Sequence, residues 1–165
     1  MKESFLNGKR ILAVDDEPDV LAVLGEEIRE GAPNCIFEKV MTYNEGVEKM
    51  VSWTYDLVIL DIMGVRGFDL LSLAVTRNFP VAMLTAHALT PEDTIKSFKE
   101  GAAYFVPKEK MGEIATYLKD VLEAKEKGKN LWSRWMSRFA AHYDEKFGKK
   151  WRVQDKDFWE RLGWD

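Results

Sequence analysis

The chain has 165 residues, of which 46% are hydrophobic, and its net charge is −4. This length favours one domain with room for a small appendage, and the composition argues against disorder over most of the chain. The mild negative charge argues against a dedicated nucleic-acid binder. No apolar run is long enough to span a bilayer, and the first residues contain no apolar signal core. We therefore expect a cytoplasmic protein without membrane insertion.

Short apolar runs alternate along the chain with amphipathic stretches. Five runs have strand character: residues 10–14, 35–40, 55–60, 81–85 and 104–106. Between and after them, apolar residues recur at helical spacing and predict helices that begin near residues 18, 44, 68, 91 and 111. These strand–helix repeats end near Ala124. The alternation predicts an α/β fold, in which helices cover both faces of a parallel sheet.

Chemically active side chains follow the predicted strands. The first strand ends in Asp15 and Asp16, the third in Asp61, and the fourth in Thr85, while Lys108 follows the fifth. In an open parallel sheet, ligands bind at the carboxyl ends of the strands. If the central strands are neighbours, three acids, a hydroxyl and an ammonium therefore meet at one edge.

The electrostatics of three carboxylates limit what this edge can do. Two carboxylates about 5 Å apart repel by roughly 3 kcal/mol at an effective dielectric near 20, so the cluster needs a cation or protons. Mg²⁺, or Mn²⁺ in its place, takes carboxylate and phosphate oxygens, and Lys108 adds a charge suited to phosphate. This set favours phosphoryl transfer to a carboxylate, with Asp61 as the nucleophile.

A structural interpretation of these acids stays open at this stage. Acids that follow strands are often helix caps, and Asp16, which precedes Pro18, has a suitable position. For any one acid, a cap or a solvated loop residue is as good an interpretation as a functional one. The joint placement of five chemically active residues at the strand ends, three acids with Thr85 and Lys108, favours function.

Four segments carry a resemblance to a known family. In chain order they read ILAVDDEPDVL, YDLVILDIM, VAMLTAHA and GAAYFVPK, and together they resemble the receiver domain of two-component response regulators. The resemblance runs from about Lys9 to Ala124. It implies a flavodoxin-like, doubly wound five-stranded sheet of order 2-1-3-4-5. It also implies a sensor histidine kinase as the partner that donates the phosphoryl group, and an unknown downstream protein.

The resemblance assigns roles to individual residues. Asp61 is the phosphoacceptor, Asp16 is the direct metal ligand, and Asp15 acts on the metal mainly through water. The remaining roles are these: the main-chain carbonyl of Met63 binds the metal, Lys108 and Thr85 bind the phosphoryl group, and Thr85 and Phe105 form the switch. A phosphoacceptor of this kind is not an ordinary enzyme, although it contributes to its own phosphorylation and dephosphorylation.

Two segments depart from the family pattern. The loop after Asp61 reads IMGVRGF, which is two residues shorter than usual and lacks a proline. Gly64 and Gly67 can supply the backbone angles that a tight loop needs. Glu109 follows Lys108 where the family usually has a proline, often with a cis bond. We expect either a trans bond with a rearranged loop or locally held strain.

The last part of the chain, residues 125–165, has a different composition. It contains 11 basic and 7 acidic residues and five of the six tryptophans. An apolar stripe at a spacing of four predicts a helix from Leu131 to Phe147 that ends at Gly148, and a second short helix within 155–163. A segment this short cannot bury its aromatics alone. We expect it to rest on the receiver domain (1–124), on a second copy of the chain as a homodimer, or on a target.

The leading hypothesis is a phosphorelay response regulator that changes conformation on phosphorylation. One alternative is a transcriptional or RNA-binding regulator whose tail is the output, although we do not expect direct nucleic-acid binding. Another is a scaffold that works without phosphorylation, which the altered loop makes worth testing. A haloacid-dehalogenase-like phosphatase is set aside, because its nucleophile is followed two residues later by a second Asp and this chain has Met63 there.

Overall fold

A computed structural model describes residues 6–86, 90–128 and 131–148, apart from the side chains of residues 132 and 133. The strands are β1 (Arg10–Val14), β2 (Ile36–Val40), β3 (Leu57–Asp61), β4 (Val81–Thr85) and β5 (Tyr104–Pro107). The α-helices are α1 (Pro18–Gly31), α2 (Tyr43–Ser52), α3 (Gly67–Thr76), α4 (Pro91–Lys99), α5 (Ile114–Lys127) and α6 (Leu131–Phe147). A 3-10 helix, η1 (Lys108–Glu113), connects β5 to α5.

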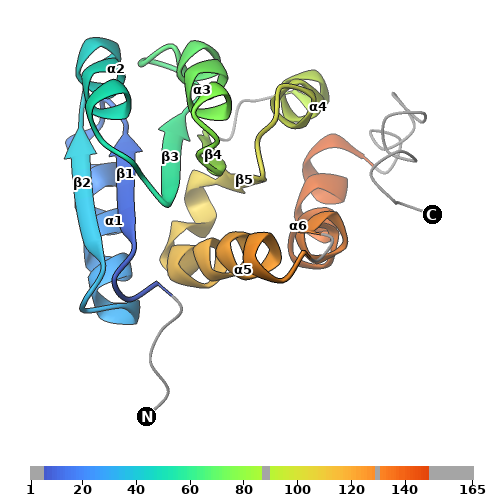
Figure 1. The fold of residues 1–165 in the computed structure, drawn as a ribbon. Helices are drawn as coiled ribbons and strands as arrows, with labels where there is room; N and C mark the ends of the chain where they lie inside the picture. The colour runs from blue at the N-terminus through green and yellow to red at the C-terminus, as the bar shows by residue number, and fades with distance from the viewer. Residues whose placement is uncertain (1–5, 87–89, 129–130, 149–165) are drawn as a thin grey trace.

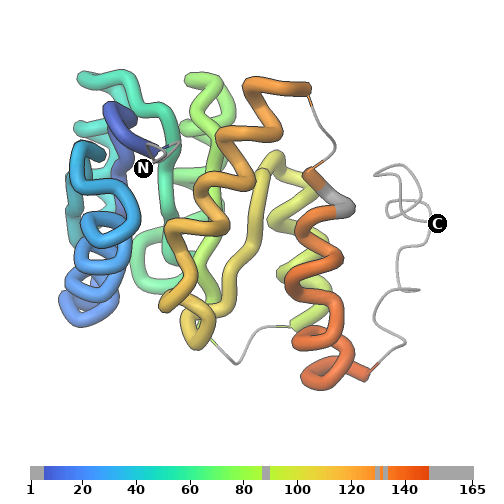
Figure 2. The backbone as a smooth tube through the Cα atoms, turned by 90° about the horizontal axis from the view of Figure 1, so that it is seen from below, coloured from blue at the N-terminus to red at the C-terminus, as the bar shows by residue number. Residues whose placement is uncertain are grey.

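The strands form one parallel sheet of order β2-β1-β3-β4-β5 (Figure 1). Helices α1 and α5 pack together on one face, and α2 and α3 pack together on the other (Figures 1 and 2). This confirms the flavodoxin-like, doubly wound topology that the sequence predicts.

The central strands are buried along their whole length, because helices cover both faces of the sheet. Every residue of β3 and of β4 is buried, whereas four of the five residues of the edge strand β2 are exposed or partly exposed. The register pairs Val14 with Leu60, Asp61 with Leu84, and Thr85 with Pro107. The residues at and just beyond the carboxyl ends of these strands are thereby brought to one edge of the sheet.

Helix α5 differs from the prediction at both ends. It begins at Ile114 rather than near residue 111, because the preceding turns form η1, which contains the poor helix former Gly112. It also runs past Ala124 to Lys127. Two lysines in its last turn interact favourably with the helix dipole. Gly128, in the left-handed conformation with φ 65°, ends the helix.

Helix α6 lies beside α4 and α5 at one end of the sheet (Figures 1 and 2). Its stripe is turned inward: Trp135, Phe139 and Tyr143 are 0%, 1% and 2% exposed and belong to the same hydrophobic cluster as the sheet. Gly148 follows the helix with φ 77°, as predicted. The stripe therefore rests on the strand–helix part of the same chain, which is the first of the three expected alternatives. The short helix predicted within 155–163 lies outside the described residues.

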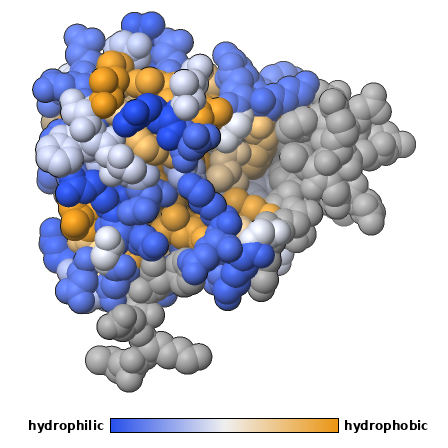
Figure 3. Space-filling model, in the orientation of Figure 1, coloured by the Kyte–Doolittle hydropathy of each residue, from blue (hydrophilic) through white to orange (hydrophobic). Residues whose placement is uncertain are grey.

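The outer surface is mostly hydrophilic on the face that Figure 3 shows, with apolar areas between charged ones. Some large apolar side chains are exposed, including Val51, Trp53 and Met63. Single exposed residues of this kind are normal on a folded surface. Among the described residues, no helix combines the length and apolarity that crossing a membrane requires.

Candidate functional site at the carboxyl edge of the sheet

Three aspartates converge where β1 and β3 end. Carboxylate oxygens of Asp15, Asp16 and Asp61 lie within 4.8 Å of one another. Asp61 is the last residue of β3, and Asp15 and Asp16 follow β1 directly. The pairing of these two neighbouring strands therefore sets the distance between the three carboxylates. Asp15 and Asp61 are 0% and 4% exposed, while Asp16 is exposed and opens the cluster to solvent.

The ammonium of Lys108 lies among these acids. Its Nζ is 3.1 Å from Asp15 Oδ2 and 3.2 Å from Asp61 Oδ1. Its shortest contact, at 2.7 Å, is with Oε2 of Glu17, where it donates a hydrogen bond. Sequence reasoning did not include Glu17 in the site. Its position directly after Asp15 and Asp16, at the start of α1, is the signal that could have found it.

The acids outnumber the cations at this edge, and the pKa values reflect it. Burial, and then the charge of Asp15, raise the pKa of Asp61 to about 6 despite the nearby lysine. Burial likewise raises the pKa of Asp15. Burial by itself would lower the pKa of Lys108, but its hydrogen bond to Glu17 and the charges of Asp61 and Asp15 raise it. The edge is thus short of positive charge.

The donor set fits a hard divalent cation. Asp15 Oδ2 is buried and accepts no hydrogen bond within the described part of the chain, although Lys108 lies near it. Carboxylate oxygens are the ligands that Mg²⁺ prefers, and exposed Asp16 leaves room for the waters that Mg²⁺ keeps. The cap interpretation of Asp16 is not supported: α1 has Glu17 as its N-cap and no side-chain cap hydrogen bond.

The short loop after Asp61 packs closely against the cluster. Gly64 has φ 82°, and a Cβ there would lie 2.4 Å from Asp16 Oδ2. A Cβ on Gly67 would lie 2.2 Å from the main-chain oxygen of Asp61. Gly64 therefore supplies an unusual backbone angle, as expected, whereas Gly67 supplies close approach, and the second left-handed residue is Arg66, with φ 56°.

The other predicted site residues are not gathered as tightly. The hydroxyl of buried Thr85 donates to the Ala86 carbonyl at 2.9 Å. The Met63 side chain is 63% exposed, and the role of its carbonyl stays a prediction. Phe105 is fully buried, with its ring 6.4 Å from that of Phe98 and 5.9 Å from that of Tyr143 on α6.

The residue after Lys108 resolves one expectation. No peptide bond among the described residues is cis, so the Lys108–Glu109 bond is trans, and the chain turns directly into η1. The Glu109 carboxylate lies 2.7 Å from Lys146 Nζ and 3.3 Å from His142 Nε2, both on α6. The position that is proline in the family thus holds an ion pair with the tail.

Comparisons with known proteins identify the family that this chain resembles. The family model of the response regulator receiver domain matches residues 11–119. The two-component response regulator ARR18 of Arabidopsis thaliana is 32% identical over 112 residues, which cover 64% of this chain and 17% of that protein. The transcriptional regulatory protein SpaR of Bacillus subtilis is 27% identical over 141 residues, which cover 83% and 62%. The chain thus spans less than two thirds of these relatives.

Solved structures of receiver domains have the same fold as this chain. A CheY-like receiver domain protein from Methanospirillum hungatei JF-1 is 25% identical with a TM-score of 0.65, and the match covers 73% of this chain and 98% of that one. The receiver domain of the Francisella response regulator 1452 shares the fold at 20% identity, with a TM-score of 0.63 over 72% and 99% of the two chains. Since the family model covers most of β1 to α5, the chain belongs to the receiver domain family of two-component response regulators.

Proposed function

We propose that the chain accepts a phosphoryl group on Asp61 from a phosphohistidine of a sensor histidine kinase. The observation that carries the proposal is the convergence of Asp15, Asp16 and Asp61 within 4.8 Å, with the Lys108 ammonium 3.2 Å from Asp61. Membership of the receiver family supports it. Asp61 ends the central strand β3, so its carboxylate is held on a rigid element, as a nucleophile requires.

The transfer needs a carboxylate oxygen and a place for charge. An Asp61 oxygen attacks phosphorus, a P–O bond forms, and the P–N bond to the donor imidazole breaks. The electron pair stays on the imidazole nitrogen, which takes up a proton. Lys108 stabilises the negative charge of the transferred group. The Thr85 hydroxyl, which donates to the Ala86 carbonyl in this structure, would turn to donate to the phosphoryl group.

The proposed cofactor is Mg²⁺, or Mn²⁺, held by carboxylates of Asp16 and Asp61 and the Met63 carbonyl, with Asp15 acting mainly through water. When bound, the ion would neutralise charge on the acids and on the incoming phosphoryl oxygens. The raised pKa of Asp61 indicates the same need, because a protonated carboxyl is a poor nucleophile. The downstream partner, a homodimer and a cytoplasmic location stay predictions.

The alternative of a nucleic-acid-binding tail gains nothing from α6. Its rings Trp135, Phe139 and Tyr143 are buried against the receiver, so in this arrangement they cannot stack on bases. Although the relative from Bacillus subtilis is a transcriptional regulatory protein, this chain spans only 62% of it. A scaffold that ignores phosphorylation would leave the acid cluster without a role.

The test is phosphoryl uptake from a small phosphodonor in the presence of Mg²⁺, followed by intact mass. The parent should gain the mass of one phosphoryl group, and chelation of the metal should abolish the gain. Asp61→Asn should not gain it, whereas Asp69→Asn, which removes an exposed carboxylate of α3, should behave as the parent. Equal uptake by Asp61→Asn and the parent would show that the acceptor is assigned wrongly.

A further inference from the structure

Helix α6 covers a face made by α4, β5 and α5. Aromatic rings fill this contact: the Trp135 ring meets Phe98 of α4 edge-on at 5.0 Å, and the Phe139 ring lies 4.8 Å from Tyr117 of α5. Figures 1 and 2 both place α6 beside these helices. Because the rings of α6 join the core cluster of the sheet, the cover is an integral part of the fold.

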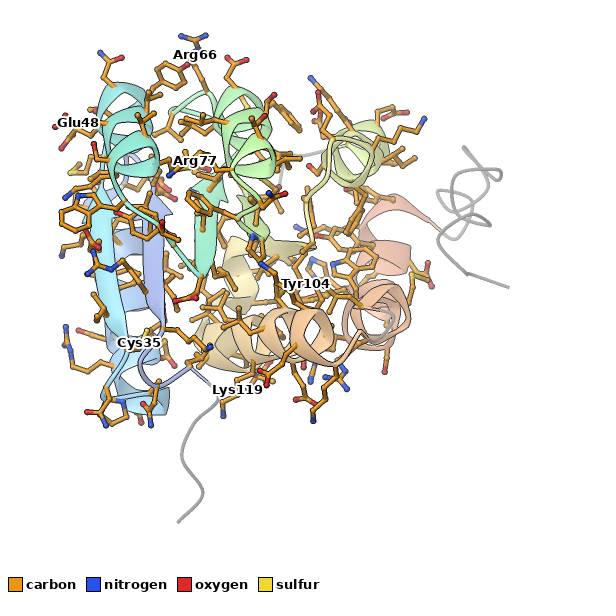
Figure 4. The ribbon with its side chains drawn as sticks, in the orientation of Figure 1. Cys35, Glu48, Arg66, Arg77, Tyr104 and Lys119 are labelled. Carbon is orange, nitrogen blue, oxygen red and sulfur yellow. The ribbon has the colours of Figure 1, made fainter. Side chains whose placement is uncertain are left out.

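A buried carboxylate anchors the middle of the cover. Asp120 of α5 is 4% exposed and accepts a hydrogen bond from the Tyr104 hydroxyl at 2.7 Å. Arg134 Nη1 donates to it at 3.2 Å, and Arg138 donates through Nε and Nη2. In Figure 4, Tyr104 lies among the side chains between the sheet and helices α5 and α6. Two guanidinium groups of α6 thus neutralise a charge that the receiver buries.

Two further contacts of α6 reach the chain segment that carries Lys108. On one side, Trp135 Nε1–H donates to the main-chain carbonyl of Phe105 at 2.9 Å. On the other side, Glu109 forms an ion pair with Lys146 at 2.7 Å, and His142 Nε2 lies 3.3 Å from the same carboxylate. Helix α6 therefore contacts residues 105 and 109, which lie three before and one after Lys108, the residue that meets Asp61.

We propose that α6 is an internal cover whose docking opposes a phosphoryl group on Asp61. This inference rests on the proposed function. With α6 docked, residues 105–109 hold Lys108 against the carboxylates of Asp15, Glu17 and Asp61. A phosphoryl group places its charge farther out than the carboxylate that it modifies, and Lys108 must shift to meet it. In this proposal the segment 105–109, which α6 contacts at both ends, shifts together with the lysine.

The coupling is reciprocal, as linkage requires. A modification that moves residues 105–109 weakens the Trp135 and Glu109 contacts and loosens α6, and a chain whose α6 is loosened takes the phosphoryl group more readily. A loosened cover exposes the aromatic face of α4, β5 and α5 around Asp120. Phosphorylation would thus change which surface this chain presents.

Beryllofluoride with Mg²⁺, as a phosphoryl mimic on the full chain, tests both directions. In the parent, it should speed amide hydrogen exchange across residues 131–147 by about tenfold, the coupling strength common between linked sites. Trp135→Ala should bind beryllofluoride about tenfold more tightly than the parent, and Lys146→Ala a few-fold more tightly, on the same scale. Lys127→Ala, which removes an exposed ion pair within α5, should bind it as the parent does.

The outcomes separate this inference from the function on which it rests. If Asp61 takes up a phosphoryl group but exchange in α6 does not change, the coupling is wrong and the phosphoacceptor stands. If the parent takes up neither phosphoryl group nor beryllofluoride, both proposals fall. Should Trp135→Ala not fold, Lys146→Ala decides, and a beryllofluoride affinity equal to that of the parent overturns the coupling.

Discussion

Two regions of this molecule bury aspartates, and they treat the charge differently. At the carboxyl edge of the sheet, Asp15, Glu17 and Asp61 share the single ammonium of Lys108 among the described contacts, and Asp16 lies beside them. Under α6, one carboxylate, that of Asp120, meets two guanidinium groups and a phenol. The first network lacks positive charge, whereas the second has more than it needs.

The difference teaches which region is built to stabilise and which to bind. A satisfied buried network makes the structure rigid, while a partly satisfied one is costly unless a ligand completes it. Burial raises the pKa of Asp61 and of Asp15, which marks the edge as incomplete. Functional sites are where such local conflicts are expected. Changes under α6 should therefore cost stability, and changes at the edge should affect ligands.

The largest effect should come from the apolar contact of α6. Phe139→Ala removes a ring that is 1% exposed and packs against Tyr117, so the free energy of unfolding in urea should fall by roughly 3–5 kcal/mol. Val51→Ala, at a side chain that is 58% exposed, should change it by less than about 0.5 kcal/mol. A loss for Phe139→Ala no larger than this control would mean that α6 contributes nothing to the core.

At the edge, removing a charge should stabilise the metal-free chain. Because the pKa of Asp61 is raised to about 6, its ionisation opposes folding. The stabilising effect of the protonated form is complete below pH about 4 and is lost as the pH rises through about 6, a change of roughly 3 kcal/mol. With a chelator at pH 7, Asp61→Asn should therefore unfold at higher urea than the parent.

This gain depends on pH and metal, which separates it from packing effects. The two chains should become equally stable below pH about 4, where the parent carboxyl is protonated. Added Mg²⁺ should stabilise the parent more than the variant. An advantage of Asp61→Asn that is the same at every pH would contradict the account of the edge.

The loop glycine should control metal affinity. A Cβ on Gly64 would lie 2.4 Å from Asp16 Oδ2, and the residue has φ 82°, so Gly64→Ala must displace the carboxylate or the loop. We expect Mg²⁺ affinity, measured by titration calorimetry, to fall by roughly tenfold. Gly112→Ala is the matched control, since a Cβ there meets nothing within 4 Å. Equal affinities of the two variants would remove Gly64 from the site.

The smallest effect separates the two neighbouring acids. Asp16→Ala should weaken Mg²⁺ binding several-fold more than Asp15→Ala, because Asp16 is proposed as the direct ligand and Asp15 as a ligand through water. Loss of a ligand that acts through water lowers metal affinity by about tenfold or more. The exposure of Asp16 and the burial of Asp15 against Lys108 agree with this division. Calorimetric titration of both variants measures it, and indistinguishable affinities would contradict it.

The sequence predicted the acid cluster because its placement is nearly local. Each acid follows an apolar strand directly, and parallel pairing does the rest. Glu17 was missed although it follows Asp15 and Asp16, because an acid at the start of a helix is already explained by the helix dipole. The stripe of α6 was predicted but the surface that it covers was not, because Asp120 and Glu109 lie beside α6 only in the folded chain.

The most direct measurement asks which atom carries the phosphoryl group. The parent chain is incubated with Mg²⁺ and a small phosphodonor, then treated with borohydride, which reduces an aspartyl phosphate to homoserine, and its peptides are sequenced by mass spectrometry. We predict homoserine at position 61 in the parent and none there in untreated chain or in chain kept with a chelator. Homoserine at another aspartate, with Asp61 intact, would contradict the central claim.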